Sequence, residues 1–232
     1  MFALFILGSP CPAAASSAPL APARAWLADT WRPLPTPRSL AILATGAALG
    51  AACTGFEDAD ASARALEHGP LHALGTFGNA YGELPVISGT ALLLYGAGRW
   101  SGHTALRETG FDAMRALAVT GATVGVLKVV VKRERPDGGR HSFPSGHAAA
   151  TMALAPVVTR HLGWRFGAPA YALALFTGMG RIQDRRHHLS DVVWGSTLGL
   201  TAGIAASQPR STTSLSYEPF VSGDRIGCAL HF

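Results

Sequence analysis

Charged residues are scarce in this sequence. Asp, Glu, Lys and Arg make up 14% of the 232 residues, while hydrophobic residues make up 48%. Soluble globular domains contain about 25% charged residues. This shortage argues against a surface that is fully exposed to water and favours a bilayer around much of the molecule. The length predicts one sizeable domain with tails.

Cysteine is also rare, and its three copies, Cys11, Cys53 and Cys228, lie far apart. An odd number of cysteines without any Cys-x-x-Cys pair indicates neither a disulfide framework nor a zinc site. The net charge is +5, but Lys and Arg form no long basic arm of the kind that binds nucleic acid. We therefore predict no metal and no nucleic-acid partner, and we expect an anionic lipid or a phosphate instead.

Apolar stretches with few charges dominate the rest of the chain. They are rich in Gly and Ala, which let membrane helices approach closely. Six helices are predicted, from residues 39–56, 84–98, 116–131, 148–159, 166–180 and 192–209. The predicted fold class is therefore all-α, a six-helix bundle over residues 39–208 that we expect to be transmembrane. Some stretches are short, because 15 helical residues cover about 22 Å of a bilayer core of about 30 Å, so buried helices of a soluble protein are the alternative.

Both ends of the chain depart from this pattern. Residues 1–38 are rich in Ala and Pro, which predicts a disordered leader, and a signal-like segment that lacks the usual positive start is the alternative. Residues 209–232 contain two strand-like runs around positions 222–224. These runs predict either a short hairpin or disorder, because a lone hairpin is marginal in water.

Loop charges provide a second test of a membrane topology, because cytoplasmic loops carry an excess of Lys and Arg. With the N-terminus inside, the acidic connection 57–83 faces outward, and the connections that contain Arg99 and Arg160 face inward. The same count puts the polar segments 132–147 and 181–191 together on the outer side. We therefore expect one polar site at the outer end of the bundle.

The first polar motif is KVVVKRERP, in which Lys128 and Arg135 are seven residues apart. This spacing is nearly two helical turns, so both cations can border one pocket. A basic flank that only fixes the topology is the alternative. A Lys inside an apolar stretch, however, usually faces a cavity or a partner.

The second motif is HSFPSGH, in which Ser145 and Gly146 lead to His147 at the predicted start of a helix. The first N–H groups of a helix lack acceptors within it and bind anions. A histidine at such a place can donate a proton to a leaving oxygen. Helix capping by Ser145 is the simpler explanation of this motif taken alone.

The third motif is GRIQDRRHHLSDVVWG, which contains Arg181, His187 and Asp191. If the chain is helical here, a step of four residues puts His187 and Asp191 on one face, where the carboxylate can fix the tautomer of the ring. The other ring nitrogen is then an activated nucleophile. A solvated basic loop followed by a helix cap is the alternative, and His188 is a second candidate for the nucleophile.

Together the three motifs, K-x6-R-P, P-S-G-H and R-x5-H-x3-D, resemble those of the type 2 phosphatidic acid phosphatase superfamily. That superfamily includes membrane lipid phosphatases, soluble bacterial acid phosphatases and vanadium-dependent haloperoxidases. The motifs extend from Lys128 to Asp191, and counting from Arg181 selects His187 rather than His188. The chain departs from the family at Gly180, where a Ser is usual.

The resemblance implies a metal-independent enzyme without cofactors that hydrolyses a lipid phosphate or diphosphate, with a phospholipid or an isoprenyl group as the lipid. It implies a multi-pass protein of a bacterial inner membrane whose site faces the periplasm. His187 is expected to attack phosphorus and become a phosphohistidine, Asp191 to orient its ring, and His147 to protonate the leaving oxygen. The residues expected to hold the phosphate are Lys128, Arg135, Ser145, Gly146 and Arg181.

Two other functions remain open, a soluble periplasmic acid phosphatase and a non-catalytic polytopic protein that binds or transports an anionic lipid. A haloperoxidase is disfavoured because the chain is short. Further positive charge comes from Lys132, Arg133, Arg140, Arg185 and Arg186, which are predicted either to bind a second phosphate or headgroup or to be solvated flanks. The remaining histidines considered, His68, His72, His103 and His161, are interpreted as ordinary loop or interface residues.

Overall fold

The structure is a computed structural model, and it describes residues 36–55, 58–208, 216–222 and 225–231. The chain divides into two compact units, and the larger one spans Asp29–Arg210. Most of the leader predicted over residues 1–38 lies outside the described residues, and the first described helix already begins at Pro37.

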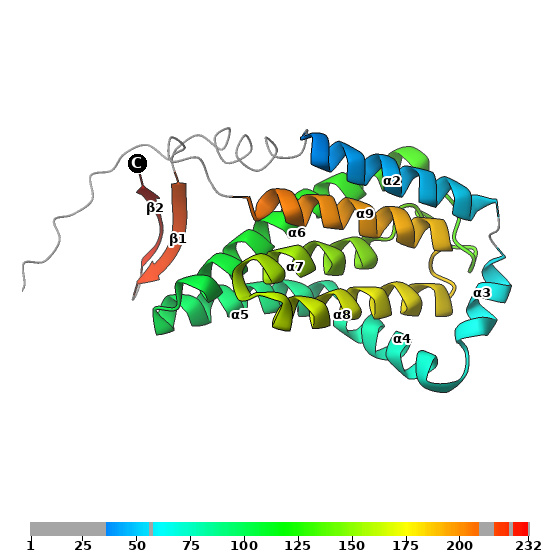
Figure 1. The fold of residues 1–232 in the computed structure, drawn as a ribbon, viewed down its shortest axis with the longest axis horizontal. Helices are drawn as coiled ribbons and strands as arrows, with labels where there is room; N and C mark the ends of the chain where they lie inside the picture. The colour runs from blue at the N-terminus through cyan, green and yellow to red at the C-terminus, as the bar shows by residue number, and fades with distance from the viewer. Residues whose placement is uncertain (1–35, 56–57, 209–215, 223–224, 232) are drawn as a thin grey trace, which may run out of the picture. The chain divides into compact units, whose positions relative to one another are not determined.

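Eight helices make up the described part of the larger unit (Figure 1). They are α2 (Pro37–Thr54), α3 (Ala59–Leu66), α4 (Gly69–Tyr81), α5 (Leu84–Ser101), α6 (Thr104–Val131), α7 (Gly146–Leu162), α8 (Trp164–Gln183) and α9 (Leu189–Ala206). The all-α prediction is confirmed for this unit, and each of the six predicted stretches overlaps one long helix. The count of six is too low for the described residues, because α3 and α4 are additional.

The additional helices lie in the segment 57–83, which was predicted to be an acidic connection. The carboxylate of Asp58 caps α3 by accepting a hydrogen bond of 2.9 Å from the backbone N–H of Ala61. Pro70 is in the first turn of α4, where proline is tolerated because its missing N–H would have no partner there. Helix α4 is held by packing, since a Cβ at Gly78 would overlap the backbone of Phe176 in α8.

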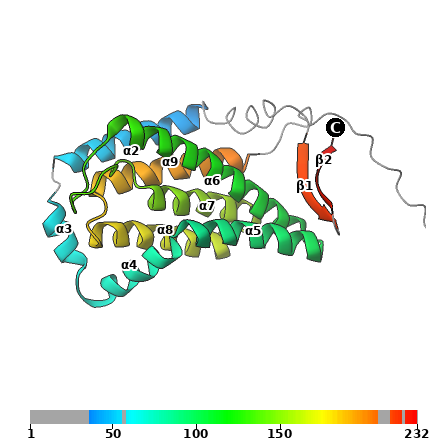
Figure 2. The ribbon, with the colours of Figure 1, turned by 180° about the vertical axis from the view of Figure 1, so that it is seen from behind.

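Helix α7 is the centre of the bundle, with α6, α8 and α9 packed around it (Figures 1 and 2). Its residues from Ala148 to Val157 are all buried. Two glycines of α9 allow a close approach, because a Cβ at Gly199 or Gly203 would overlap a carbonyl oxygen of α7. Small residues of this kind let two helix backbones come together, and here they bring the second half of α9 against the first half of α7.

One helix among the described residues, α6, is by itself long and apolar enough to cross a bilayer. Helices α2 and α3 meet the same criterion only as a bent pair. Only 28% of the most apolar window of α6 is buried within the molecule. The transmembrane bundle therefore stays a prediction.

The smaller unit contains two strands, β1 (Ser216–Ser222) and β2 (Arg225–His231). They pair antiparallel, with Ser216 opposite His231 and Ser222 opposite Arg225. A hairpin was one of the two arrangements predicted for residues 209–232.

Candidate active site

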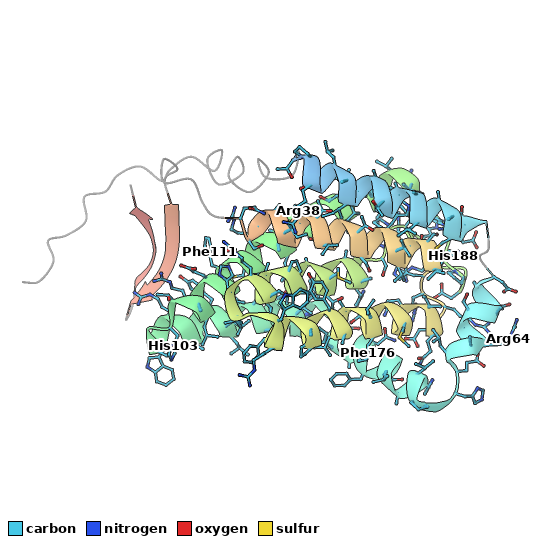
Figure 3. All side chains as sticks on the ribbon, viewed as in Figure 1. Arg38, Arg64, His103, Phe111, Phe176 and His188 are labelled. Atoms are coloured by element: carbon cyan, nitrogen blue, oxygen red, sulfur yellow. The ribbon has the colours of Figure 1, made fainter. Side chains whose placement is uncertain are left out.

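The three motifs meet at one end of the helical bundle, where α6 and α8 end and α7 and α9 begin; His188 marks this end in Figure 3. A cavity of about 270 Å³ opens there. Six of the eight predicted site residues line it: Lys128, Arg135, Gly146, His147, Arg181 and His187. The other two are next to it in the chain or in space, since Ser145 precedes Gly146 and Asp191 lies behind His187.

Backbone hydrogen bonds hold the second and third motifs together. The N–H of Ser145 donates to the carbonyl oxygen of Asp191 at 2.9 Å. A Cβ at Gly195, one turn along α9, would overlap the carbonyl oxygen of Ser145. Because the first turn of α7 rests on the first turn of α9, His147 and His187 line the same cavity.

His187 does not lie on a helix, which corrects the expected geometry. It precedes α9, whose N-cap is His188. The Nδ1 atom of His187 is 3.9 Å from Oδ2 of Asp191, and the same carboxylate oxygen accepts a hydrogen bond of 2.9 Å from the N–H of His188. The capping turn, and not a shared helical face, brings ring and carboxylate together, so Asp191 acts both as a cap and as a partner of His187.

Burial lowers the pKa of His187 below its usual value of 6.5, while the Asp191 carboxylate works in the opposite direction. The cations Lys128 and Arg181 lower this pKa further. The side chain of His187 is 2% exposed. Its imidazole is therefore neutral at neutral pH, as a nucleophile must be. His188 does not line the cavity, so the geometry favours His187 of the two.

The cations around the cavity have donors without acceptors. Within the described part of the chain, Nε of Arg135, Nε of Arg181 and Oγ of Ser145 are buried and have no hydrogen-bond partner. Lys128 donates from Nζ to the carbonyl oxygen of His141 at 2.6 Å, which leaves two of its N–H groups for other acceptors. Buried polar groups are almost always paired, so these donors favour binding of an anion in the cavity.

Asp191 has partners that the sequence did not reveal. Its carboxylate is fully buried, Oδ2 accepts a hydrogen bond from Oγ of Ser142, and Oδ1 accepts one from Nη1 of Arg133 at 2.9 Å. Arg133 was predicted either to bind a second phosphate or a headgroup or to be a solvated flank, and its guanidinium is paired with the buried Asp191 carboxylate, a contact that neither interpretation includes. No motif spacing identifies Arg133 or Ser142.

His147 faces a carboxylate that the sequence analysis did not assign to the site. Its Nε2 is 3.7 Å from Oε1 of Glu83, which is the N-cap of α5. Glu83 is exposed, so this contact lies at the mouth of the cavity. Each histidine of the site therefore has a carboxylate beside it, a buried one for His187 and an exposed one for His147.

Gly180, the departure from the family pattern, has a structural reason. A Cβ at this position would overlap the carbonyl oxygen of Gly75 and lie 2.7 Å from the side chain of Asn79, both in α4. Asn79 donates to the carbonyl oxygen of Gly180 at 3.1 Å and accepts from Nη1 of Arg181 at 3.4 Å. The additional helix α4 therefore occupies the space of a serine side chain and contacts Arg181 instead.

Two of the extra cations near the site are paired with carboxylates. Arg185 is 3.1 Å from Asp60 of α3, and Arg186 is 3.0 Å from Asp137. Lys132 and Arg140 are exposed. These four side chains are largely exposed, so the choice between headgroup binding and solvated flanks stays a prediction for them.

His161, interpreted from the sequence as an ordinary loop or interface histidine, lies at the interface between α7 and α6. Its Nε2 is 2.9 Å from Oδ2 of Asp112, and Asp112 also accepts a hydrogen bond of 3.3 Å from Nη1 of Arg115. Asp112 precedes Lys128 by sixteen residues on α6, a rise of roughly 24 Å. This cluster therefore lies far from the candidate site.

Comparison with known proteins agrees with the motifs. The family model described as "PAP2 superfamily" matches residues 110–213, a range that contains all three motifs. A lipid A 1-phosphatase of Porphyromonas gingivalis is 38% identical over 96 residues, which are 40% of this chain and 21% of the relative. The chain therefore matches only about a fifth of the length of this relative.

Two solved structures have a similar fold. One is Aquifex aeolicus LpxE, with a TM-score of 0.52 and 22% identity over 60% of this chain and 87% of that one. The other is a transmembrane PAP2-type phosphatidylglycerolphosphate phosphatase from Bacillus subtilis, with a TM-score of 0.52 and 20% identity over 80% of this chain and 93% of that one. Residues 110–213, which contain the three motifs, are thus similar in sequence to the PAP2 superfamily, and the fold is similar to that of the two solved structures.

Proposed function

We propose that this protein is a metal-independent phosphatase that hydrolyses a lipid phosphate or diphosphate through a phosphohistidine on His187. The observation that carries the proposal is the group of buried donors without acceptors around a histidine-lined cavity. A phosphoryl group supplies the acceptors that Arg135, Arg181 and Ser145 lack. Fixed positive charge around its oxygens provides the electrostatic stabilisation on which phosphoryl transfer depends.

The reaction has two steps. Since Nδ1 of His187 faces Asp191, Nε2 attacks phosphorus, and the bond from phosphorus to the leaving oxygen breaks as the N–P bond forms. His147 gives its proton to that oxygen, and Asp191 stabilises the positive imidazole of His187. Burial lowers the pKa of His147 to about 4 in the free protein, so the proposal requires the negative phosphoryl group to raise this pKa and keep His147 protonated in the complex. A water molecule then attacks phosphorus, His147 takes a proton from it, and the N–P bond breaks to release inorganic phosphate.

The proposed phosphate-binding groups are the side chains of Lys128, Arg135, Ser145 and Arg181, together with the N–H of Gly146. Gly146 is the first residue of α7, and N–H groups at the start of a helix bind anions. Gly146 also lines the cavity.

A lipid substrate is proposed because much of the cavity is apolar. Leu84 and Ile87 of α5, Leu117 and Val124 of α6, and Ala150 of α7 continue the cavity away from the cations. Similar chains act on lipids by their names, lipid A in one case and phosphatidylglycerolphosphate in another. A phospholipid or isoprenyl phosphate has a charged head for one side of the cavity and a hydrocarbon part for the other.

We further propose a multi-pass protein of a bacterial inner membrane, with residues 39–208 as the catalytic domain and the site facing the periplasm. Large apolar side chains of α5 and α6 are exposed: Leu92 57%, Leu93 74%, Val126 63%, Val129 64% and Val130 70%. Hydrocarbon is a better environment than water for such surfaces. The orientation follows from the loop charges, which put the acidic segment 57–83 outside.

A soluble phosphatase with the same site is the second candidate, because only α6 among the described helices meets the criterion for a span by itself. Extraction of membranes with alkaline carbonate separates the two. Release into the supernatant would support the soluble enzyme, and retention in the pellet would support the membrane protein.

The decisive experiment measures phosphate release by the purified full-length protein from a panel of lipid phosphates and diphosphates in EDTA. We expect turnover that EDTA does not reduce and that His187→Ala abolishes. Rapid acid-free quenching followed by mass spectrometry should find a phosphoryl group on His187 of the wild type. Lipid-phosphate binding without any release would instead support a non-catalytic lipid binder.

A further inference from the structure

The Asp191 carboxylate is held from several sides in a place that water does not reach. Its side chain is 0% exposed, and its hydrogen-bond donors are Oγ of Ser142, the N–H of His188 and Nη1 of Arg133. Of these, only Arg133 carries a charge. A buried carboxylate without a cationic partner tends to take up a proton, and a neutral carboxyl group stabilises a positive imidazole much less.

Arg133 differs from the other cations of the site in where its guanidinium lies. Lys128, Arg135 and Arg181 line the cavity, whereas Arg133 does not. Its Nη1 is 2.9 Å from Oδ1 of Asp191 and 2.7 Å from Oγ of Ser190. Arg133 therefore contacts the Asp191 carboxylate from outside the cavity that we propose for the substrate.

The loop after α6 connects two of these partners. The carbonyl oxygen of Arg133 accepts a hydrogen bond of 2.8 Å from the N–H of Ser142, and Oγ of Ser142 donates to Asp191. Both carboxylate oxygens are thus held by one short loop, Oδ1 by Arg133 and Oδ2 by Ser142. The carboxylate has little freedom to rotate away from the ring of His187.

We propose that Arg133 is a positioning residue, which keeps the Asp191 carboxylate charged and oriented toward Nδ1 of His187 while the phosphohistidine forms and breaks. The inference rests on the proposed phosphatase function. It assigns Arg133 to the rate of the chemical step and not to substrate binding. The alternative, binding of a headgroup or a second phosphate, assigns it to substrate affinity.

The first test compares Arg133→Gln with wild type on a lipid phosphate that the wild type hydrolyses. We expect kcat to fall by about 10- to 100-fold, as when outer partners of metal-bound histidines are removed, with KM and the inhibition constant of orthovanadate within about twofold of wild type. The matched control is Arg140→Gln, which removes an equal charge from the same loop at an exposed position and should change neither constant. A raised KM with unchanged kcat would overturn the proposal in favour of a headgroup contact, and an unchanged kcat and KM would also overturn it.

A second pair of variants separates positioning from loss of the fold. Arg133→Lys keeps a positive charge that can donate to Asp191, so its kcat should lie between those of wild type and Arg133→Gln. Added guanidinium ion should raise the kcat of Arg133→Ala and leave His187→Ala inactive. If Lys is as slow as Gln and guanidinium has no effect on Arg133→Ala, the role of Arg133 is only structural and the inference fails.

Failure of the inference is distinct from failure of the phosphatase assignment. A wild-type protein that releases no phosphate from any lipid phosphate contradicts the proposed function itself. An active wild type with a fully active Arg133→Gln contradicts only the positioning role.

Discussion

Two clusters near opposite ends of α6 each contain a histidine, an aspartate and an arginine. They are His161, Asp112 and Arg115 at the far end, and His187, Asp191 and Arg133 at the near end, where further cations line the cavity. At the far end, Arg115 donates to Asp112 at 3.3 Å and to the carbonyl oxygen of Ala206 at 3.4 Å, and His161 contacts Asp112 at 2.9 Å. At the near end, Arg135 and Arg181 have buried nitrogens without acceptors. His103, at the start of α6, and His188, beside the site, lie at opposite ends of the bundle in Figure 3.

This difference distinguishes charged side chains that are paired within the protein from charged side chains whose donors are open to a ligand. A buried charge costs free energy unless it is paired. At the far end the protein supplies the partners, so the cluster ties α6 to α7 and α9. At the near end it leaves donors open around a cavity, so the partner must come from outside. Four experiments test this contrast, from the largest expected effect to the smallest.

The largest contrast is between the two histidines that lie beside an aspartate. His187→Ala removes the proposed nucleophile and should lower kcat by on the order of 10⁴-fold or more. His161→Ala, at the far end, should leave kcat within a few-fold of wild type. Initial rates of phosphate release under saturating substrate measure both, and His188→Ala is the neighbouring control that should keep a measurable rate.

Removal of an arginine at each end should affect opposite properties. Arg115→Gln takes a partner from the buried Asp112 and should lower the free energy of unfolding by about 3 to 5 kcal/mol, with little change in kcat at a temperature where the variant is folded. Arg135→Gln should lower kcat by about 10²- to 10³-fold, as for loss of one oxyanion donor, with little loss of stability. Thermal unfolding and steady-state kinetics should be measured on both variants. Equal losses of activity would contradict the assignment of Arg115 to stability and of Arg135 to the proposed reaction.

The family serine should not be tolerated at position 180. Gly180→Ser puts a side chain into the contact with Gly75 and Asn79 of α4 and should lower the free energy of unfolding by about 1 to 3 kcal/mol, as overpacking does. The control is Gly125→Ser in α6, where an added Cβ meets nothing within 4 Å. A more stable or faster Gly180→Ser protein would show that α4 does not pack here as described.

The smallest effect is a shift in pH dependence. Because burial lowers the pKa of His187 below 6.5, the neutral nucleophile persists at pH values at which a solvent-exposed histidine is already protonated. The acid limb of kcat/KM should therefore fall below pH 6.5, and the variant Asp191→Asn, which loses the charge that raises this pKa, should move the limb to still lower pH. An acid limb above pH 6.5 in the wild type would contradict the burial of a neutral His187.

The same lowered pKa affects the free energy of unfolding. As pH falls, the histidine of the unfolded chain takes up a proton before the buried His187 does. The contribution of His187 to the free energy of unfolding is therefore complete above pH 6.5 and decreases below it.

Much of the bundle and of the site could be predicted from local signals. Apolar stretches predicted the six long helices, and the spacing of Lys128, Arg135, His147 and His187 indicated which polar residues meet. The two short helices were missed because Asp58 and its acidic neighbours look like a loop until α4 is seen against α8. A hydrophobic pattern predicts which residues of a segment are buried. It does not predict which other segment packs against them.

The sequence alone was enough to predict the chemistry that we propose for this protein, because the three motifs have characteristic residue types at short, fixed spacings that do not depend on distant contacts. Only the tertiary structure decided which charges are free to meet a substrate. Arg133 and Asp191 are 58 positions apart, and Gly180 and Asn79 are 101 positions apart, so their pairing has no local signature. Whether an arginine faces a ligand, a carboxylate or solvent depends on what other segments bring within hydrogen-bond distance, and that is a property of the folded chain.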